Sequence, residues 1–492
     1  MTRVQSWDLV VIGGGPAGIA AASEAADLGA SVLLIERHAL GGTSLHTGSV
    51  PSRALARSAS KIASARDADV FGARTRGSVR VDFEQVLARS RWIERRIGEG
   101  LPLFRAAVGK VEIVRGRARF ETSSSVRVGH RTVGFGRAIV ATGVRPRRLP
   151  IRGLARVGYL TSDDVFDVRT LPRRLAVVGG GPLGCELAQV FCRLGSRVTL
   201  IQDDAKFLPR EERDASEILS RALARDGVEI RLGTRVVGAR RSRGGKVLET
   251  LREGASADIE ADEILLSVGR VPNVGDLGLD AARIRYDESA GIAVDDHLRT
   301  SARRVYAAGD VCSAHRFTHV AEATGRMAAA NALGARSRAS DILPPRCTFT
   351  DPEIAHVGMR AVDAFDAGLA IESYAVMMHD VDRAITDGLE DGFVKIHVAA
   401  GTDRIVGATI VASRASEMIA ELVLAMQNDL GMCDVAAAVH TYPAQANAIA
   451  SAARAFVETR ARSALVPVRM SAGHRRALHP DGVEPVHLKN AR

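Results

Sequence analysis

The sequence has few cysteines, few aromatic residues and no long apolar run, and each shortage excludes a class of protein. No two of the cysteines form a CxxC pair, and their spacing is irregular. This pattern argues against a disulfide framework, a zinc site and a thioredoxin-like redox pair. We therefore expect reduced, mostly buried thiols and no bound metal. The cysteines are Cys185, Cys192, Cys312, Cys347 and Cys433.

The apolar run at residues 9–12 is too short for a signal peptide or a membrane helix, so we expect a cytoplasmic protein with no membrane partner. Aromatic residues make up 4% of the chain, and the net charge is +10. The arginine-rich segments at 145–152 and 235–243 contain no aromatic residue that could stack on bases. We therefore expect a solvated basic surface and no nucleic-acid partner.

Two stretches, residues 9–37 and 175–203, repeat one pattern. Each has an apolar strand, a glycine turn, an Ala/Leu-rich helix and a second apolar strand. The pattern is typical of a βαβ dinucleotide-binding unit, so two copies predict an α/β chain with two Rossmann-like domains. Other patterns predict helices at 50–65, 83–104, 415–427 and 444–462, and strands at 228–232, 247–251, 263–268, 393–398 and 405–411.

The first glycine turn carries the three glycines that a dinucleotide requires. Gly13 permits the tight turn, Gly15 lets a pyrophosphate approach the backbone, and Gly18 lets the helix pack on the strand. The start of the following helix offers amide donors to phosphate. Glu36 ends the next strand, where a carboxylate can accept both hydroxyls of an adenosine ribose.

The second glycine turn repeats this arrangement with Gly179, Gly181 and Gly184. Gln202 stands at the position of the acid. An amide can bond a ribose hydroxyl, but it does not repel a 2′-phosphate as a carboxylate would. The two aspartates that follow favour NADH, and the sequence leaves NADPH open.

The loop at residues 41–53 resembles the GGTCxxxGCxPSK loop of the FAD-dependent pyridine nucleotide-disulfide oxidoreductases, such as lipoamide dehydrogenase and mercuric reductase. In that family the two cysteines form the disulfide that takes electrons from reduced flavin. Ser44 and Ser49 occupy the two cysteine positions here. A serine cannot form a disulfide, and it is not ionised near neutral pH. The chain therefore resembles a class I member of the family that lacks the redox cysteine pair.

The resemblance covers about residues 8–462. It implies that FAD binds the first glycine turn and NAD(P)H the second. In the family, the acid of the AxGD segment bonds the ribityl chain of the flavin. The further cofactor-binding residues that it implies are Gly42 and Thr43 in the serine loop, Ala141, Thr142 and Gly143 in an ATG segment, Gly269 and Arg270 in a GRxPN segment, and Gly309 and Asp310 in the AxGD segment.

Two further departures concern groups that act beside the flavin. Glu186 matches the family acid that pairs with the lysine of PSK, but its partner position holds Arg53, whose planar fork is not equivalent to an ammonium. An ordinary structural ion pair is the alternative reading. The closing segment HPTxxE has Tyr442 and Asn447 in place of His and Glu. Tyrosine is a poor base near neutral pH but a usable hydrogen-bond donor.

The resemblance also implies the domain organisation and a homodimer, in which Tyr442 would reach the acceptor bound to the other subunit. We expect a discontinuous FAD-binding domain at 1–160 and 284–341 and an NAD(P)-binding domain at 161–283. A C-terminal α+β dimerisation domain at 342–466 and a basic tail at 467–492 complete the chain.

The sequence therefore predicts a FAD-dependent NAD(P)H oxidoreductase that passes hydride from nicotinamide to flavin and then to a small-molecule electron acceptor. Without a dithiol relay, we expect a quinone-like acceptor, with Ser44, Ser49, Arg53, Glu186 and Tyr442 as the active-site residues. Two alternatives stay open: a soluble pyridine nucleotide transhydrogenase and a non-catalytic FAD-binding protein. Dithiol chemistry through one of the other cysteines is the least favoured alternative.

Overall fold

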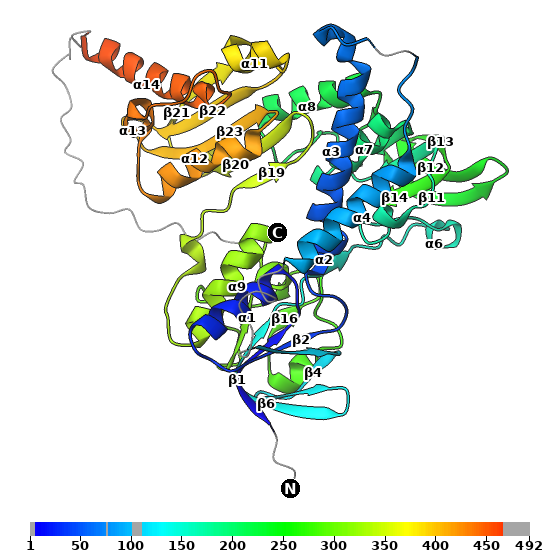
Figure 1. Cartoon of the computed structure of the whole chain (residues 1–492), viewed down its shortest axis with the longest axis vertical. Helices are drawn as coiled ribbons and strands as arrows, with labels where there is room; N and C mark the ends of the chain where they lie inside the picture. The colour runs from blue at the N-terminus through cyan, green and yellow to red at the C-terminus, as the bar shows by residue number, and fades with distance from the viewer. Residues whose placement is uncertain (1–4, 75–76, 101–110, 466–492) are drawn as a thin grey trace.

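The computed structural model describes residues 5–74, 77–100 and 111–465, which form three units (Figure 1). The first unit lies at the bottom of the view, the second at the right and the third at the upper left. Helix α3 (Ser49–Arg66) leaves the first unit and runs along the second, where it packs on α7 (Pro182–Leu194). The predicted basic tail and the end of the predicted helix 83–104 lie outside the described residues. The predicted domain boundaries stay predictions.

The first unit is a mainly parallel sheet in which two distant parts of the chain meet. Strand β1 pairs in parallel with β2 and β6, and β18 (Val305–Ala307) pairs in parallel with β6. The chain therefore returns to the first sheet after leaving the second unit, as predicted. The sheet order is β3 (Val111–Arg115), β2 (Val32–Glu36), β1 (Ser6–Ile12), β6 (Arg131–Val140), β5 (Ser125–Val128) and β4 (Ala118–Thr122), and the helices are α1 (Pro16–Asp27), α2 (Gly42–His46), α4 (Phe83–Glu99) and α9 (Thr318–Ala332).

The second unit repeats the parallel arrangement and adds an antiparallel sheet. Two short strands, β7 (Val144–Pro146) and β15 (Arg270–Pro272), pair where the chain enters and leaves the unit. The parallel strands are β10 (Glu229–Arg231), β9 (Arg197–Ile201), β8 (Arg174–Val178) and β14 (Glu263–Leu266), the antiparallel strands are β11 (Arg235–Ser242), β12 (Gly245–Arg252) and β13 (Ala255–Ala261), and the helices include α6 (Leu154–Val157) and α8 (Arg213–Asp226).

The third unit is an antiparallel sheet covered by helices. Helix α12 packs on β20 and β23, and α14 packs on β21 and β22. The sheet order is β19 (Arg346–Thr348), β20 (Glu353–Gly358), β23 (Ile405–Ala412), β22 (Phe393–Ala399) and β21 (Ile371–Met377), and the helices are α10 (Ala361–Asp366), α11 (Asp382–Asp387), α12 (Ala415–Gln427), α13 (Met432–Ala437) and α14 (Asn447–Leu465).

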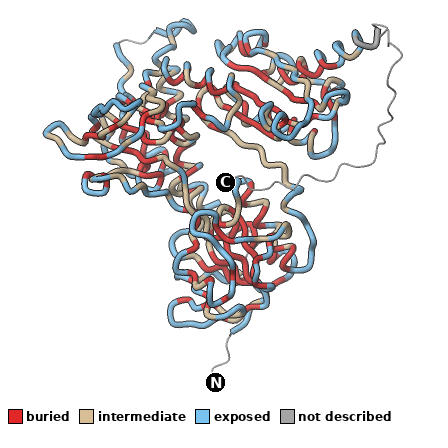
Figure 2. The backbone as a smooth tube through the Cα atoms, turned by 180° about the vertical axis from the view of Figure 1, so that it is seen from behind, coloured by how far each residue is buried: buried red, intermediate tan, exposed pale blue. Residues whose placement is uncertain are grey.

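The central strands carry the cores of the units, as the buried segments of Figure 2 show. Leu9, Val10 and Val11 are all fully buried, because both faces of the sheet are covered. Leu9 and Val11 pack with helices α1 and α9, and Val10 packs with strands β4 and β5 and the segment 274–311. In the first unit, α1 crosses α9 at close range: a Cβ on Gly325 would lie 2.2 Å from the carbonyl oxygen of Ala17. This crossing sets the start of α1, directly after the first glycine turn, against the middle of α9.

The secondary structure agrees with most of the predicted elements. The five cysteines are free, as predicted, but the prediction that most of them are buried is wrong. Cys185 alone is buried, Cys433 is exposed, and the other three cysteines have intermediate exposure. In the described part of the chain, no helix combines the length and the apolar composition that crossing a membrane would require.

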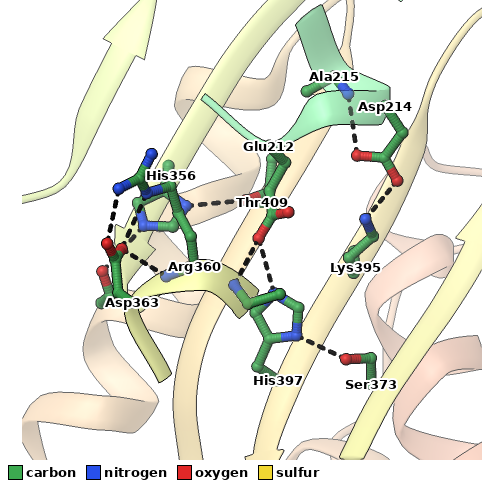
Figure 3. Close-up of polar contacts among 12 residues, drawn as sticks. Glu212, Asp214, Ala215, His356, Arg360, Asp363, Ser373, Lys395, His397 and Thr409 are labelled. Atoms are coloured by element: carbon green, nitrogen blue, oxygen red, sulfur yellow. Dashed lines mark hydrogen bonds and ion pairs between the residues drawn. The ribbon is translucent and has the colours of Figure 1, made fainter. Parts of the chain in front are cut away.

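Polar side chains on one face of the third unit's sheet bond to residues of the second unit (Figure 3). His397 Nε2 on β22 lies 3.0 Å from Glu212 Oε1 at the start of α8, and the same oxygen accepts the backbone N–H of Ala361 at 2.9 Å. Lys395 pairs with Asp214 beside it. Burial opposes the charge on Glu212, but these donors together lower the pKa of Glu212 to about 2.

The same face of the sheet holds a second buried imidazole, that of His356. His356 is 1% exposed, its Nδ1 lies 2.8 Å from Thr409 Oγ1, and its Nε2 lies 2.9 Å from the carbonyl oxygen of Gly358. Burial, with a contribution from the charge on Arg346, lowers the pKa of His356 to about 4 from its ordinary 6.5. Between about pH 6.5 and about pH 4, the unfolded chain therefore binds a proton that the folded chain excludes. The free energy of unfolding falls as the pH drops through this range.

We expect His356 to cost up to about 3 kcal/mol of stability as the pH falls through that range. Glu212 acts in the same direction at still lower pH, since its folded pKa lies below the unfolded value. The thermal midpoint measured from about pH 7 to about pH 5 should fall, and the fall should be smaller in His356→Gln. An equal fall in both proteins would contradict the assignment.

Candidate active site

The first glycine turn, between β1 and α1, is shaped by steric limits. Gly13 has φ +107°, and a Cβ there would lie 2.4 Å from the carbonyl oxygen of Ala141. A Cβ on Gly18 would lie 1.7 Å from the carbonyl oxygen of Gly13. A Cβ on Gly15 would meet only the Cα of Gly42, at 3.8 Å, so the backbone at Gly15 stays accessible. The turn therefore offers an uncovered backbone surface at the start of a helix, which fits a pyrophosphate.

Glu36 lies beside this turn, at the end of β2. Its Oε2 accepts the Gly14 N–H at 2.6 Å, and its Oε1 accepts the His38 N–H at 2.7 Å. Each carboxylate oxygen can accept a further hydrogen bond. The carboxylate is thus held in place by the backbone and retains capacity for the hydroxyls of a ribose.

The second turn reproduces the first in geometry. Gly179 also has φ +107°, and a Cβ on Gly184 would lie 2.0 Å from the carbonyl oxygen of Gly179. A Cβ on Gly181 would meet nothing within 4 Å, so the backbone there is open. Gln202 Oε1 accepts the Gly180 N–H at 2.7 Å, as Glu36 does in the first turn, and this bond leaves its amide nitrogen as a donor.

The ATG and GRxPN segments lie side by side where the two units join. Thr142 Oγ1 donates to the carbonyl oxygen of Asn273 at 2.8 Å, and Asn273 Nδ2 donates to the carbonyl oxygen of Thr142 at 2.9 Å. The backbone N–H of Asn273 donates to the carbonyl oxygen of Gly143 at 2.9 Å, beside Ala141. Asn273 belongs to the same GRxPN segment as Gly269 and Arg270. The structure therefore brings together the ATG and GRxPN segments, which are distant in the sequence.

The AxGD segment follows β18 and reaches the start of α1. A Cβ on Gly309 would lie 2.9 Å from the Cβ of Ala17. Burial raises the pKa of Asp310, while the charges of Arg270 and Arg316 oppose that rise. A carboxylate at this position, close to the first glycine turn, fits a hydroxyl-rich chain that extends from a bound pyrophosphate.

The serine loop closes on a third hydroxyl. Ser44 on α2 shares a hydrogen bond with Thr318, and Ser49 Oγ lies 3.3 Å from the same Thr318 Oγ1. Thr318 is the first residue of α9, and Ser49 is the first residue of α3. The sequence marks Thr318 by no motif, and only the fold shows that it joins the two serines into one hydroxyl cluster, Ser44–Thr318–Ser49.

Arg53 and Glu186 form an ion pair that joins all three units. Arg53 Nη2 pairs with Glu186 Oε2, while Arg53 Nη1 donates to the carbonyl oxygen of Phe349 at 3.0 Å. Glu186 is 7% exposed, and its Oε1 accepts the Phe349 N–H at 2.8 Å. The guanidinium also lies over the ring of Phe349, 4.1 Å from its centroid. Phe349 is thus a third member of this group that the sequence alone did not identify as such.

Tyr442 lies apart from these groups within one chain. It belongs to the third unit, and 75% of the residue is exposed. Its hydroxyl donates to Asp382 Oδ2 at 2.5 Å. Among the described residues, no hydrogen bond joins Tyr442 to Ser44, Ser49 or Arg53.

The fold and these sites define the class of protein: a flavoprotein with one binding unit for FAD, a second for a nicotinamide dinucleotide, and a third sheet domain. Residues 7–325 match the pyridine nucleotide-disulphide oxidoreductase family, and residues 344–453 match its dimerisation domain. The chain belongs to this family. The dimerisation domain supports a homodimer.

Relatives of known activity cover nearly the whole chain. The dihydrolipoyl dehydrogenase of Thermus scotoductus is 34% identical over 462 residues, which are 92% of this chain and 98% of the relative. The mercuric reductase of Shigella flexneri is 32% identical over 461 residues, which are 91% of this chain and 80% of the relative.

Solved structures agree with this assignment. LpdA from Mycobacterium tuberculosis has a TM-score of 0.83 at 27% identity, covering 92% of this chain and all of that one. The HOCl-induced flavoprotein disulfide reductase RclA from Escherichia coli has a TM-score of 0.81 at 26% identity, covering 90% of this chain and 98% of that one. The protein is therefore a flavoprotein oxidoreductase whose cofactors are FAD and NAD(P).

Proposed function

We propose that this protein is a FAD-dependent NAD(P)H oxidoreductase that passes electrons directly to a small, non-disulfide acceptor, with a quinone-like molecule as the favoured class. The observation that carries the proposal is the hydroxyl cluster Ser44–Thr318–Ser49. Two of its members, Ser44 and Ser49, stand at the loop positions where the resemblance implies the redox disulfide of the family. Hydroxyl groups can bind an oxygen-containing acceptor, but they cannot store electrons.

The remaining cysteines support a reaction without a dithiol relay. None of them precedes residue 185 in the sequence, so none lies on the serine loop. Burial raises the pKa of Cys192 to about 11 and that of Cys312 to about 12. Burial likewise raises the pKa of Cys185 and Cys347, and partial desolvation together with the neighbouring Asp403 raises the pKa of the exposed Cys433. Thiols held in the neutral form are weak nucleophiles, so these side chains are poor substitutes for the missing pair.

The chain's own residues would prepare the site for direct transfer. FAD, when bound, carries the two electrons of a hydride from the nicotinamide to the acceptor. The ion pair of Glu186 and Arg53 would hold the two cofactor units in one relative position. Both members of the pair also bond the backbone of Phe349. The hydroxyls of Ser44, Ser49 and Thr318 would donate to an acceptor oxygen. Such donors favour the charge that develops when a carbonyl is reduced.

The cofactor assignments of individual residues are part of the same proposal. The first glycine turn, with Glu36 and Asp310, would hold FAD, and the second turn would hold NADH or NADPH. Gln202 accepts either nucleotide, because its amide carries no charge that would repel a 2′-phosphate. Tyr442 would reach the acceptor site from the partner subunit of a homodimer.

The first test measures NADH and NADPH oxidation with four acceptors: menadione, thio-NAD, lipoamide and glutathione disulfide. We expect turnover with menadione and none with the two disulfides. Turnover with thio-NAD alone would identify a transhydrogenase. The absence of turnover with every acceptor, in a protein that retains its FAD, would favour a non-catalytic role and overturn the proposal.

Restoring the two sulfurs should restore electron storage. In the double variant Ser44→Cys/Ser49→Cys, the two sulfurs would lie near one another, because both side chains contact the same Thr318 hydroxyl. We expect anaerobic NADH consumption to rise from one to two equivalents per flavin, with a new long-wavelength absorbance from a thiolate next to the flavin. The single variants serve as controls and should stay at one equivalent. A double variant that also stays at one equivalent would show that the loop does not lie against the flavin.

A further inference from the structure

The Tyr442 hydroxyl is held by a carboxylate that no sequence motif marks. Asp382, 60 residues earlier, accepts a hydrogen bond from this hydroxyl, with an oxygen–oxygen distance of 2.5 Å. The Asn447 side chain, at the position of the family's glutamate, is bonded to backbone instead: its Oδ1 accepts the Ala444 N–H at 2.8 Å, and its Nδ2 donates to the carbonyl oxygen of Thr441 at 3.1 Å. The carboxylate that contacts Tyr442 therefore comes from helix α11 and not from the helix that follows Tyr442.

The fold sets the geometry of this pair. Asp382 is the first residue of α11, and Ala384 on the same helix is fully buried in the core of the third unit. Arg383 bonds Asp387 at 2.8 Å along the helix and donates to the carbonyl oxygen of Pro443 at 3.4 Å. These contacts tie the start of α11 to the loop that carries Tyr442.

The charge of Asp382 determines what the tyrosine can do. The hydrogen bond to Asp382, together with the negative charge, raises the pKa of Tyr442. The phenol therefore keeps its proton and directs it at Asp382. The other titratable groups of the loop and the helix are engaged elsewhere, since His440 Nε2 lies 2.8 Å from Glu421 Oε1 and Arg383 bonds Asp387.

The pair lies on a surface whose apolar side chains are uncovered in a single chain. Val439 is fully exposed, and Ile385 on α11 is 49% exposed. Both belong to the dimerisation domain, so a second copy of the chain is the occupant that fits this surface. In such a dimer, the Tyr442–Asp382 pair would face the partner subunit.

We propose that Tyr442 and Asp382 form a proton relay for the acceptor site, in which Asp382 is the positioning residue that orients and reprotonates the tyrosine. The inference rests on the proposed function and adds the source of the proton. Two electrons and one proton reach the acceptor as a hydride equivalent from NAD(P)H. Asp382 takes a proton from solvent and donates it to the Tyr442 oxygen, and the tyrosine's own O–H turns from Asp382 to the acceptor. The second proton then passes from Tyr442 to the acceptor oxygen as the carbonyl π bond breaks, and the proton from Asp382 replaces it on Tyr442.

The variant Asp382→Asn separates proton transfer from orientation. Its amide oxygen can still accept the tyrosine proton, but it cannot carry a proton. The NADH-reduced enzyme is mixed with menadione in a stopped-flow instrument, and the return of flavin absorbance is followed. We expect Asp382→Asn and Tyr442→Phe each to slow this step about 100-fold, with no further loss in the double variant. Reduction by NADH should be unchanged, and kcat for menadione should fall with little change in KM.

The matched control is Asp380→Asn, which removes the same charge from an exposed carboxylate two residues earlier. It should reoxidise at the wild-type rate. Wild-type reoxidation in Asp382→Asn, with a slow Tyr442→Phe, would overturn the relay while the proposed function stands. If menadione does not reoxidise the wild-type enzyme, the proposed function fails and the relay with it.

Discussion

The variant Gly18→Val should be purified without FAD. A Cβ at this position would lie 1.7 Å from the carbonyl oxygen of Gly13, so α1 must move away from β1 and the glycine turn must open. Backbone atoms cannot yield as the end of a flexible side chain can, and we expect a cost of about 3 kcal/mol or more in the first unit. That cost corresponds to about 100-fold weaker retention of FAD. The measurement is the ratio of flavin to protein absorbance after gel filtration.

The variant Gly184→Val should give the complementary result: a yellow protein that NADH does not reduce. A Cβ at Gly184 would lie 2.0 Å from the carbonyl oxygen of Gly179, which distorts the second turn and leaves the first unit intact. We expect the rate of flavin reduction at a fixed NADH concentration to fall about 100-fold or more. Anaerobic stopped-flow absorbance checks this result.

The two glycine variants control for each other, because the same change is made in two equivalent turns. If Gly184→Val loses FAD while Gly18→Val keeps it, the assignment of the two cofactors is reversed. If both lose FAD, the effect is general misfolding, which a lowered thermal midpoint in both proteins would reveal.

The fold was largely predictable, because its strongest signals are local. Apolar strands followed by glycine turns identified both Rossmann-like units, and helix α12 occurs at the predicted residues 415–427. The steric role of Gly13 and Gly18 also follows from their spacing alone. The Glu36 and Gln202 side chains, each at the end of a strand, bond the equivalent backbone N–H of their turns, as their matching positions suggested.

The parts of the site that were missed depend on contacts between distant segments. Thr318 meets Ser44 across 274 residues, and Phe349 meets Glu186 across 163 residues. Asp382 resembles any exposed carboxylate in the sequence until the fold sets it beside Tyr442. A single sequence reports the residue types of a motif, but it does not report which loops the sheets bring together.

Electrons should stop at the flavin, and anaerobic titration of the purified protein with NADH is the measurement that decides this. We expect one equivalent to bleach the flavin absorbance, with no thiolate-to-flavin charge-transfer band. Consumption of a second equivalent together with such a band would show a redox-active thiol pair and contradict the account.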